Sequence, residues 1–260
     1  LIYRGALLIV TEGTGTIIIS SDAFNALGNG YIPDFPAMGF LPEMHKLTLL
    51  LGIIAIVFFV MSELNSRRRK QAYNFEVLPM NIFVLKLVLT SLLIGGIAWT
   101  LAGYNGLSWT VVIVLLVVGI YHFITTQTVL GRHIYAIGGN PEAAELSGIS
   151  VKKITYTVFC SMGMLSGLSG MLFASRLQSA TTTAGTLFEL DAIAAAFVGG
   201  VSAAGGVGKV TGALIGALVM MSLTSGMNLM GIGIAYQYMV RGAVLAAAVI
   251  FDVATRNQGK

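Results

Sequence analysis

Charged residues are scarce in this chain of 260 residues. Asp, Glu, Lys and Arg together make up 10% of it, whereas a typical soluble domain has about 25%. Apolar residues make up 56%, and the mean hydropathy is +0.85. So little charge cannot cover a globular surface in water, which excludes a soluble domain and makes lipid the expected solvent.

Cysteine is nearly absent as well. Cys160 stands alone, which excludes a disulfide within the chain and a thiolate metal cluster. No set of His, Cys and carboxylate residues has the spacing of metal ligands, so we predict no metal site. The net charge is +4, but the basic residues are few and lie beside apolar runs, which is a pattern of membrane topology and not of nucleic-acid binding.

Six apolar runs approach the ~20 residues that a membrane-spanning helix needs. They lie at about residues 47–61, 82–101, 109–124, 154–174, 207–223 and 236–253. These runs predict an all-α, polytopic transmembrane helical bundle that forms a single domain over residues 1–260. The opening LIYRGALLIV has the pattern of the end of another spanning helix, so we expect a fragment that lacks N-terminal spans.

Charge differs sharply between the loops. Residues 12–45 contain four acids and no Lys or Arg, whereas residues 63–80, residues 131–153 and the C-terminal tail are basic. Because short basic loops stay in the cytoplasm, we predict that 12–45 is extracytoplasmic and that the other three, including the C-terminus, are cytoplasmic. This topology requires a fourth crossing after residue 153. Residues 188–201 are the candidate, with a re-entrant half-helix as the alternative.

Small residues recur four apart inside the predicted spans. The pairs are Gly163 and Gly167, Gly212 and Gly216, and Ala213 and Ala217. This spacing lets helix backbones approach closely, so we predict tight helix packing there; the alternative is that these residues are merely permissive.

Two motifs suggest enzymes, and neither holds. GGVGKVTG at 205–212 resembles a phosphate loop. That loop needs a Gly five residues before the Gly of the Gly-Lys pair and a Ser or Thr after the Lys, but Ala203 and Val210 occupy these positions. GLSG at 167–170 resembles the nucleophile motif of rhomboid-type intramembrane proteases. That family supplies the base from a later span, whereas all three histidines here come earlier. We therefore predict no catalytic residues.

Polar side chains inside or beside the late spans are functional candidates, because such groups are costly in lipid. Hydroxyl, amide and aromatic groups would suit a path for a hydroxyl-bearing solute, and the candidates are Asn228, Tyr236, Gln237 and Arg241. Interhelical hydrogen bonding is an equally good interpretation. The stretch RLQSATTTAGTLFELD either lines a hydrophilic path or forms an outer loop, and its charged residues Arg176, Glu189 and Asp191 are candidates for the outer face.

The stretch YAIGGNPEAAELSGIS at 135–150 is polar and punctuated like a short helix. Asn140 is a good N-cap, Pro141 fits the first helical position, Glu142 lies near the positive helix end, and Gly148 suits the left-handed C-terminal position. The helix would span about two turns, and helices shorter than ~12 residues are marginal alone. We therefore expect a docking partner.

Several blocks resemble the permease subunits of bacterial ATP-binding-cassette importers for monosaccharides. They are GRHIYAIGGNPEAAELSGI at 131–149, the long block at 174–218, and YQYMVRGAVLAAAVIFD at 236–252. GNGYIPDF at 28–35 and SELNSRRRKQAYNFEV at 62–77 look most like the multiple-monosaccharide and xylose branch. The resemblance covers essentially the whole chain, although family members carry additional N-terminal spans.

The resemblance implies a bacterial inner-membrane permease that imports a monosaccharide such as xylose. Two permease copies would form the pore, an external sugar-binding protein would contact the outer face, and a separate ATPase would bind ATP on the cytoplasmic face. This chain would then need no cofactor and hydrolyse nothing. The loop 131–153 would dock on the ATPase through a coupling helix, with the residues Asn140, Pro141, Glu142, Ala144, Glu145, Leu146 and Gly148.

An ion-coupled secondary transporter of small polar solutes is the alternative function. Its coupling needs an ionisable residue deep in the membrane, and Arg241 is the candidate. A lone arginine is a poor proton carrier because it does not deprotonate in proteins. Sodium coupling through an unwound segment at the Gly-rich residues 199–208 stays open.

Overall fold

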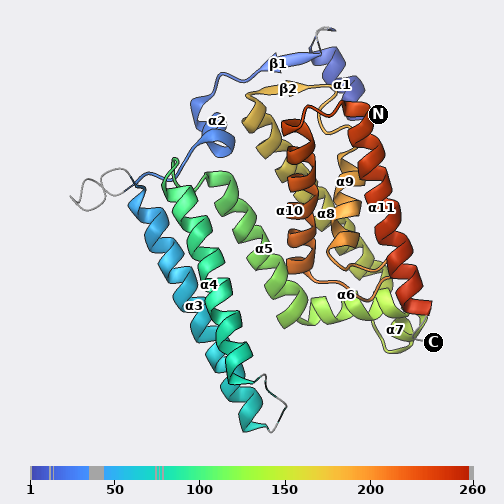
Figure 1. Cartoon of the computed structure of the whole chain (residues 1–260). Coiled ribbons are helices and arrows are strands. Elements are labelled where there is room, and N and C mark those ends of the chain that lie inside the picture. The colour runs from blue at the N-terminus through green and yellow to red at the C-terminus, as the bar shows by residue number, and fades with distance from the viewer. Residues whose placement is uncertain are drawn as a thin grey trace. The chain divides into compact units, whose positions relative to one another are not determined.

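The computed structural model describes residues 2–11, 13, 15–34, 44–73, 75, 77 and 79–257. It divides the chain into two compact units, one made of Leu1–Ser20 and Ile113–Lys260 and the other of Ser21–Val112. Figure 1 shows the helices of both units. Six described helices are long and apolar enough to cross a membrane, which confirms the prediction of an all-α polytopic protein.

The unit Ser21–Val112 is built on a helical hairpin. The short helix α2 (Asp22–Asn29) precedes α3 (Lys46–Ala72), which packs along α4 (Met80–Ala102), and α5 (Trp109–Gln127) begins here before it continues into the other unit. Gly52 of α3 is buried against Ala98 of α4, so the two helices touch closely. Much of the predicted loop 12–45 lies here, but residues 35–43 are outside the described residues.

Helix α3 is longer than its apolar run. The prediction that residues 63–80 form a loop is wrong for residues up to Ala72, because the RRRK stretch continues the helix. Arg, Lys, Gln and Glu are good helix formers, so the helix extends past the point where apolar residues stop. At 1.5 Å per residue, the 27 residues of α3 span about 40 Å, more than the ~30 Å of a bilayer core.

The other unit contains the remaining elements. They are α1 (Ile2–Val10), β1 (Thr16–Ile18), α6 (Val129–Gly139), α7 (Pro141–Leu146), α8 (Val151–Leu177), β2 (Ser179–Thr181), α9 (Phe188–Val198), α10 (Val210–Leu229) and α11 (Ile234–Asn257). The strands β1 and β2 pair antiparallel, with Ile17 opposite Ala180. Helix α9 packs on both α10 and α11, around a core of Ala194, Ala195 and Met220.

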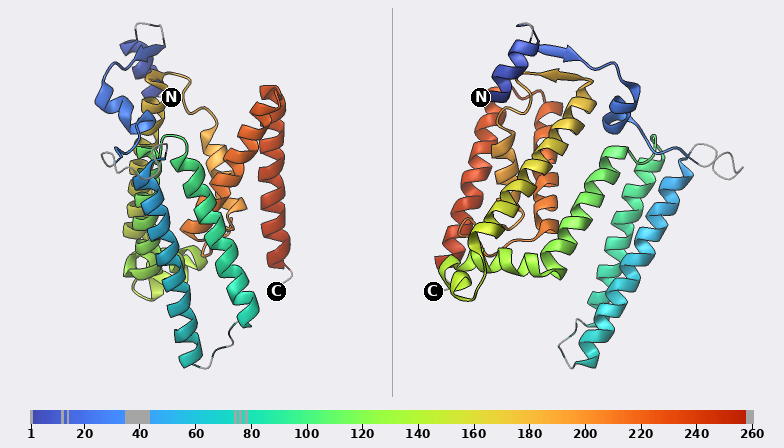
Figure 2. Two further views of the ribbon diagram at one scale, coloured as in Figure 1. Left: turned by 60° about the vertical axis from the view of Figure 1, so that its left-hand side comes forward. Right: turned by 180° about the vertical axis from the view of Figure 1, so that it is seen from behind.

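The segment 188–201 traverses its unit. It follows β2 at one end, and the loop after it reaches α6 at the other end, as the views in Figure 2 show. The choice between a crossing and a re-entrant half-helix stays a prediction, because α9 is not among the six helices long and apolar enough to span. The 11 residues of α9 alone are too short to cross a bilayer, so a crossing here would include the non-helical segments on both sides of the helix.

Candidate functional site

Helix α7 has the caps that the sequence predicts. The Asn140 side chain accepts a hydrogen bond from the Ala143 amide at 3.0 Å, and Pro141 begins the helix. At the other end the Gly148 amide donates to Glu145 O and the Ile149 amide to Ala144 O, which together form a Schellman motif. Gly148 has φ of +82°, a left-handed conformation that favours glycine. Both ends of this short helix are therefore closely defined.

One side of α7 is buried and the other is exposed. Ala144 is 4% exposed and faces the neighbouring helices α6 and α8, on which α7 packs. Leu146 is 90% exposed, and Pro141, Glu142 and Glu145 are exposed beside it. An apolar side chain displayed among acids on a polar segment is a suitable contact for a partner protein.

Helix α6, which leads into α7, was missed by the sequence analysis. The Thr128 hydroxyl caps it by accepting from the Gly131 amide. Gly138 and Gly139 form the last residues of α6, directly before the N-cap of α7. A Thr N-cap four residues after an apolar run was the signal that would have located the start of this helix.

Helix α6 touches the loop that joins α9 to α10. The Tyr135 hydroxyl donates to Gly208 O at 2.8 Å. A Cβ atom on Gly138 would lie 2.5 Å from the Gly206 nitrogen, so the two backbones are in direct contact and only glycine fits there. A movement of α6 is therefore transmitted to the loop 199–209 without a flexible side chain between them.

The same loop is tied to the end of α11. The carboxylate of Asp252 accepts hydrogen bonds from the Ser202 hydroxyl and the Ala203 amide, both at 3.2 Å. The C-terminal part of α11 therefore lies at the same end of the unit as α6 and α7. The predicted topology likewise puts the C-terminus and the loop 131–153 on one side of the membrane.

The predicted small-residue packing is confirmed in α10 and not in α8. A Cβ on Gly216 would collide with Ala195 O, and one on Gly212 with Gly199 O, so α9 and α10 are in backbone contact. Ala217 packs against the same core. In contrast, a Cβ on Gly163 or Gly167 would meet nothing within 4 Å among the described residues, so this face of α8 is open.

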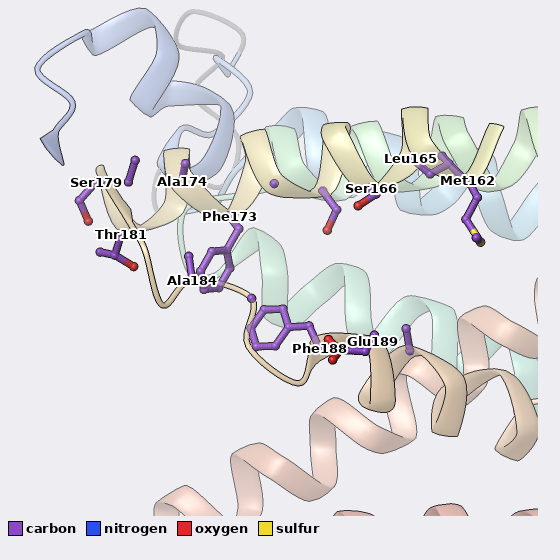
Figure 3. Close-up of a pocket in the computed structure, with 15 residues that line it drawn as sticks. Met162, Leu165, Ser166, Phe173, Ala174, Ser179, Thr181, Ala184, Phe188 and Glu189 are labelled. Atoms are coloured by element: carbon purple, nitrogen blue, oxygen red, sulfur yellow. The ribbon is translucent and has the colours of Figure 1, made fainter. Parts of the chain in front are cut away.

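A pocket of about 630 Å³ lies between α8 and α9 and reaches β2. This volume is within the range of ~300–1,000 Å³ that is typical of ligand pockets. Figure 3 shows Phe173 and Phe188 facing one another across it, with ring centroids 5.1 Å apart and an interplanar angle of 85°. Ser166 of α8 and Glu189 of α9 also line it.

The lining of this pocket offers hydroxyl, carboxylate and aromatic groups. Glu189 is the one charged residue among the described residues of the wall, and the hydroxyls come from Ser166, Ser169, Ser179 and Thr181. Such groups accept and donate hydrogen bonds to a polar solute, while aromatic rings supply an apolar surface. The stretch RLQSATTTAGTLFELD, which the sequence offered as the lining of a hydrophilic path, supplies Ser179, Thr181 and Glu189. The spacing of Ser166 and Ser169, which share one face of a helix, was the missed signal.

The predicted solute-path residues of α10 and α11 are not in this pocket. The Gln237 side chain is 6% exposed and donates to Asn228 Oδ1 and to Ile232 O, each at 2.8 Å. These bonds hold the α10–α11 turn together. Tyr236 is 67% exposed. A role of these residues in the solute path stays a prediction.

Arg241 and Asp191 form an ion pair between α11 and α9. Arg241 Nη1 lies 2.8 Å from Asp191 Oδ2, and the side chains are 19% and 29% exposed. Asp191 therefore faces α11, while Glu189 faces the pocket and Arg176 is exposed in the last turn of α8. Contact of these three residues with a binding protein stays a prediction.

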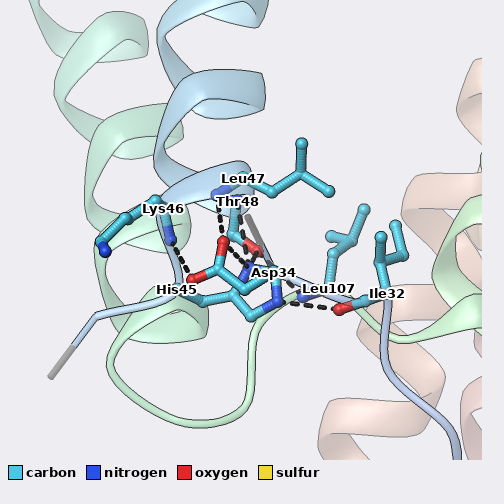
Figure 4. A network of polar contacts seen from close by, with 7 residues as sticks. All are labelled: Ile32, Asp34, His45, Lys46, Leu47, Thr48 and Leu107. Atoms are coloured by element: carbon cyan, nitrogen blue, oxygen red, sulfur yellow. Dashed lines mark hydrogen bonds and ion pairs between the residues drawn. The ribbon is translucent and has the colours of Figure 1, made fainter. Parts of the chain in front are cut away.

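His45 belongs to a network of hydrogen bonds at the start of α3. Its Nδ1 accepts from the Thr48 amide, its Nε2 donates to Ile32 O at 2.8 Å, and Asp34 accepts from the Lys46 and Leu47 amides, as Figure 4 shows. The Thr48 hydroxyl also accepts from the Leu107 amide. The network satisfies the free amides of a helix start and joins three segments of the unit, which is a structural role.

Six described helices that are long and apolar enough to span a membrane define the class as a polytopic membrane protein. The chain belongs to the family described as branched-chain amino acid transport system / permease component, which matches residues 42–249.

Individual relatives are sugar permeases. The chain is 38% identical over 258 residues to the xylose transport system permease protein XylH of Escherichia coli K12, a match that covers 99% of this chain and 63% of that protein. It is 35% identical to XylH of Haemophilus influenzae, over 99% of this chain and 66% of that protein. The ribose import permease protein RbsC of Escherichia coli K12 is 50% identical over 126 residues, or 48% of this chain and 39% of that protein.

The chain thus spans less than two thirds of the length of the xylose permeases that it matches. No solved structure matches it.

Proposed function

We propose that the chain is the membrane-spanning part of an ATP-binding-cassette importer permease that moves a monosaccharide, xylose or several sugars, into the cytoplasm. The main support is a continuous path of contacts from the exposed helix α7 through α6 and the loop 199–209 to α9. Helix α9 in turn forms one wall of the pocket. The family and the sugar-permease relatives support an importer and give no support to ion coupling.

In this mechanism, α7 docks on a separate ATPase on the cytoplasmic face. ATP binding and closure take place in that partner, so this chain needs no cofactor and carries no ATPase site. Because α7 packs on α6, and α6 is in backbone contact with the loop 199–209, a movement of α7 would shift α6, this loop and α9 together. A shift of α9 relative to α8 changes the pocket and would open it to one side at a time, as alternating access requires.

The pocket is proposed as part of the sugar path. Monosaccharides present hydroxyl groups around an apolar ring face, and the wall offers Glu189, several hydroxyls and the Phe173–Phe188 pair. A second permease copy would cover the open small-residue face of α8, since close helix approach favours such faces. An external sugar-binding protein would deliver the solute, and the C-terminus would be cytoplasmic in a bacterial inner membrane.

The test is a charge reversal on α7 in the full permease, reconstituted in vesicles with the ATPase and the binding protein. Glu145→Arg should abolish most ATP-dependent uptake and weaken ATPase association, because Glu145 is exposed beside Leu146 and makes no structural side-chain bond among the described residues. Gly148→Val should act similarly by straining the C-cap. Membrane insertion should be normal in both.

Asp22→Arg is the matched control. Asp22, like Glu145, is an exposed acid on a short helix, and it lies in the predicted extracytoplasmic segment. Its reversal should leave ATPase association unchanged. Full ATP-dependent uptake by both α7 variants would contradict the docking assignment. Uptake that survives ATP depletion and stops with an uncoupler would instead favour a secondary transporter.

A further inference from the structure

The basic end of the α3–α4 hairpin lies about one bilayer thickness from the start of α3. Arg67 follows the start of α3 at Lys46 by 21 residues, which is about 32 Å along the axis at 1.5 Å per residue. The hydrocarbon core of a bilayer is ~30 Å thick. A span that starts near Lys46 therefore brings Arg67 and the basic residues that follow it to the polar boundary of the membrane.

A small pocket of about 100 Å³ opens between the two helices at this level. It is lined by Ser66, Arg67, Lys70 and Phe83 and by the ion pair of Glu63 with Lys86, whose atoms lie 2.8 Å apart. The lining has three cations, Arg67, Lys70 and Lys86, and one carboxylate, so its net charge is positive. Glu63 is paired with Lys86, and the charges of Arg67 and Lys70 remain to attract an anion. A compact anion such as a phosphate group fits both the size and the charge of this pocket.

Arg67 is held in place by the packing of the hairpin. Its guanidinium lies 4.5 Å above the ring of Phe83, which is itself 4% exposed. Its Nη1 atom is buried and has no hydrogen-bond partner among the residues that the structure describes. A buried guanidinium donor is costly when unpaired, and phosphate oxygens suit the planar fork of arginine.

We propose that this pocket binds the phosphate of an anionic phospholipid headgroup. A second cavity of about 510 Å³ shares Ser66 and Lys70 with the pocket and continues along α3 to Met61 and Phe58. The two neighbouring cavities together are basic at one end and apolar at the other, which matches a headgroup with its acyl chain and not a free phosphate ion. Basic pockets between membrane helices are suited to anionic lipids. The site is independent of the transported solute.

The experiment uses the full chain, delipidated in detergent, and native mass spectrometry with phosphatidylglycerol, phosphatidylcholine or inorganic phosphate as the probe. Phosphatidylglycerol should bind in preference to phosphatidylcholine. Arg67→Gln should lower its affinity by about tenfold or more, the effect of losing a charged hydrogen bond. Lys70→Gln should lower it by about fivefold, and this variant keeps the test valid if Arg67→Gln fails to fold, because Lys70 is exposed.

Arg68→Gln is the matched control. Arg68 is exposed on the same helix and lines neither cavity, so its loss removes the same charge and should change affinity less than about threefold. Equal losses for Arg67→Gln and Arg68→Gln would overturn the site. So would equal binding of the two lipids, or inorganic phosphate as the preferred probe. Weaker ATPase association in Arg67→Gln with unchanged lipid binding would assign the cluster to a protein partner and also overturn the proposal.

Discussion

The ion pair of Arg241 with Asp191 should stabilise the contact of α9 with α11. Arg241 lies seven residues after the start of α11, which is about 10 Å along the helix axis. Removal of one partner of a fully buried pair costs about 3–5 kcal/mol, whereas exposed pairs contribute ~1 kcal/mol or less. Side chains that are 19% and 29% exposed lie between these limits, so we expect about 2–3 kcal/mol for Arg241→Gln.

A double-mutant cycle measures this coupling. Arg241→Gln and Asp191→Asn each leave one charge without its partner, and each should lower the midpoint of thermal unfolding by roughly 4–12 °C in detergent. The double variant leaves neither charge and should be at least as stable as the less stable single variant, because two amides form a hydrogen bond without desolvated charge. Lys153→Gln, an exposed position, is the control and should shift the midpoint little.

Two outcomes would refute this reasoning. If each single variant shifts the midpoint no more than Lys153→Gln does, the pair makes no net contribution to stability. If the loss of stability in the double variant equals the sum of the two single losses, then Arg241 and Asp191 act independently. The 2.8 Å contact between them is then not the cause of the destabilisation.

Two further predictions concern the packing of α9, which walls the pocket, and the binding of sugar in the pocket. Gly216→Ala should destabilise the protein by about 1–3 kcal/mol, because the new methyl group collides with Ala195 O. Gly119→Ala, where nothing lies within 4 Å, should be neutral or stabilising in the same thermal unfolding assay. Glu189→Gln should raise the KM for sugar uptake by about tenfold while ATPase association is unchanged; an unchanged KM would place the sugar path elsewhere.

The membrane spans could be read from the sequence because they depend on local composition. Each of the six apolar runs lies wholly or mostly within one helix, and each helix extends past at least one end of its run. The largest error was α3, whose basic end continues as helix, since hydropathy marks where lipid contact ends and not where backbone hydrogen bonding ends. The missed helix α6 has mixed polarity, so an apolar-run search passes over it.

The two candidate sites differ in how far the sequence reveals them. The caps of α7 were predictable because Asn140, Pro141 and Gly148 act on backbone groups only a few residues away. The pocket was not, because its walls come from α8 and α9, which the sequence does not place side by side. The same limit applies to Arg241 and Asp191, which are 50 residues apart.

The sequence by itself determined that this is a polytopic helical membrane protein with a short, capped helix on a basic segment. Composition, run length and capping are local properties, and each follows from residues within one or two helical turns. Tertiary structure alone decided that α6 touches the loop 199–209 and that α9 crosses its unit between α10 and α11. These contacts join residues far apart in the chain, and packing selects them through the fit of particular glycines, such as Gly138 against Gly206.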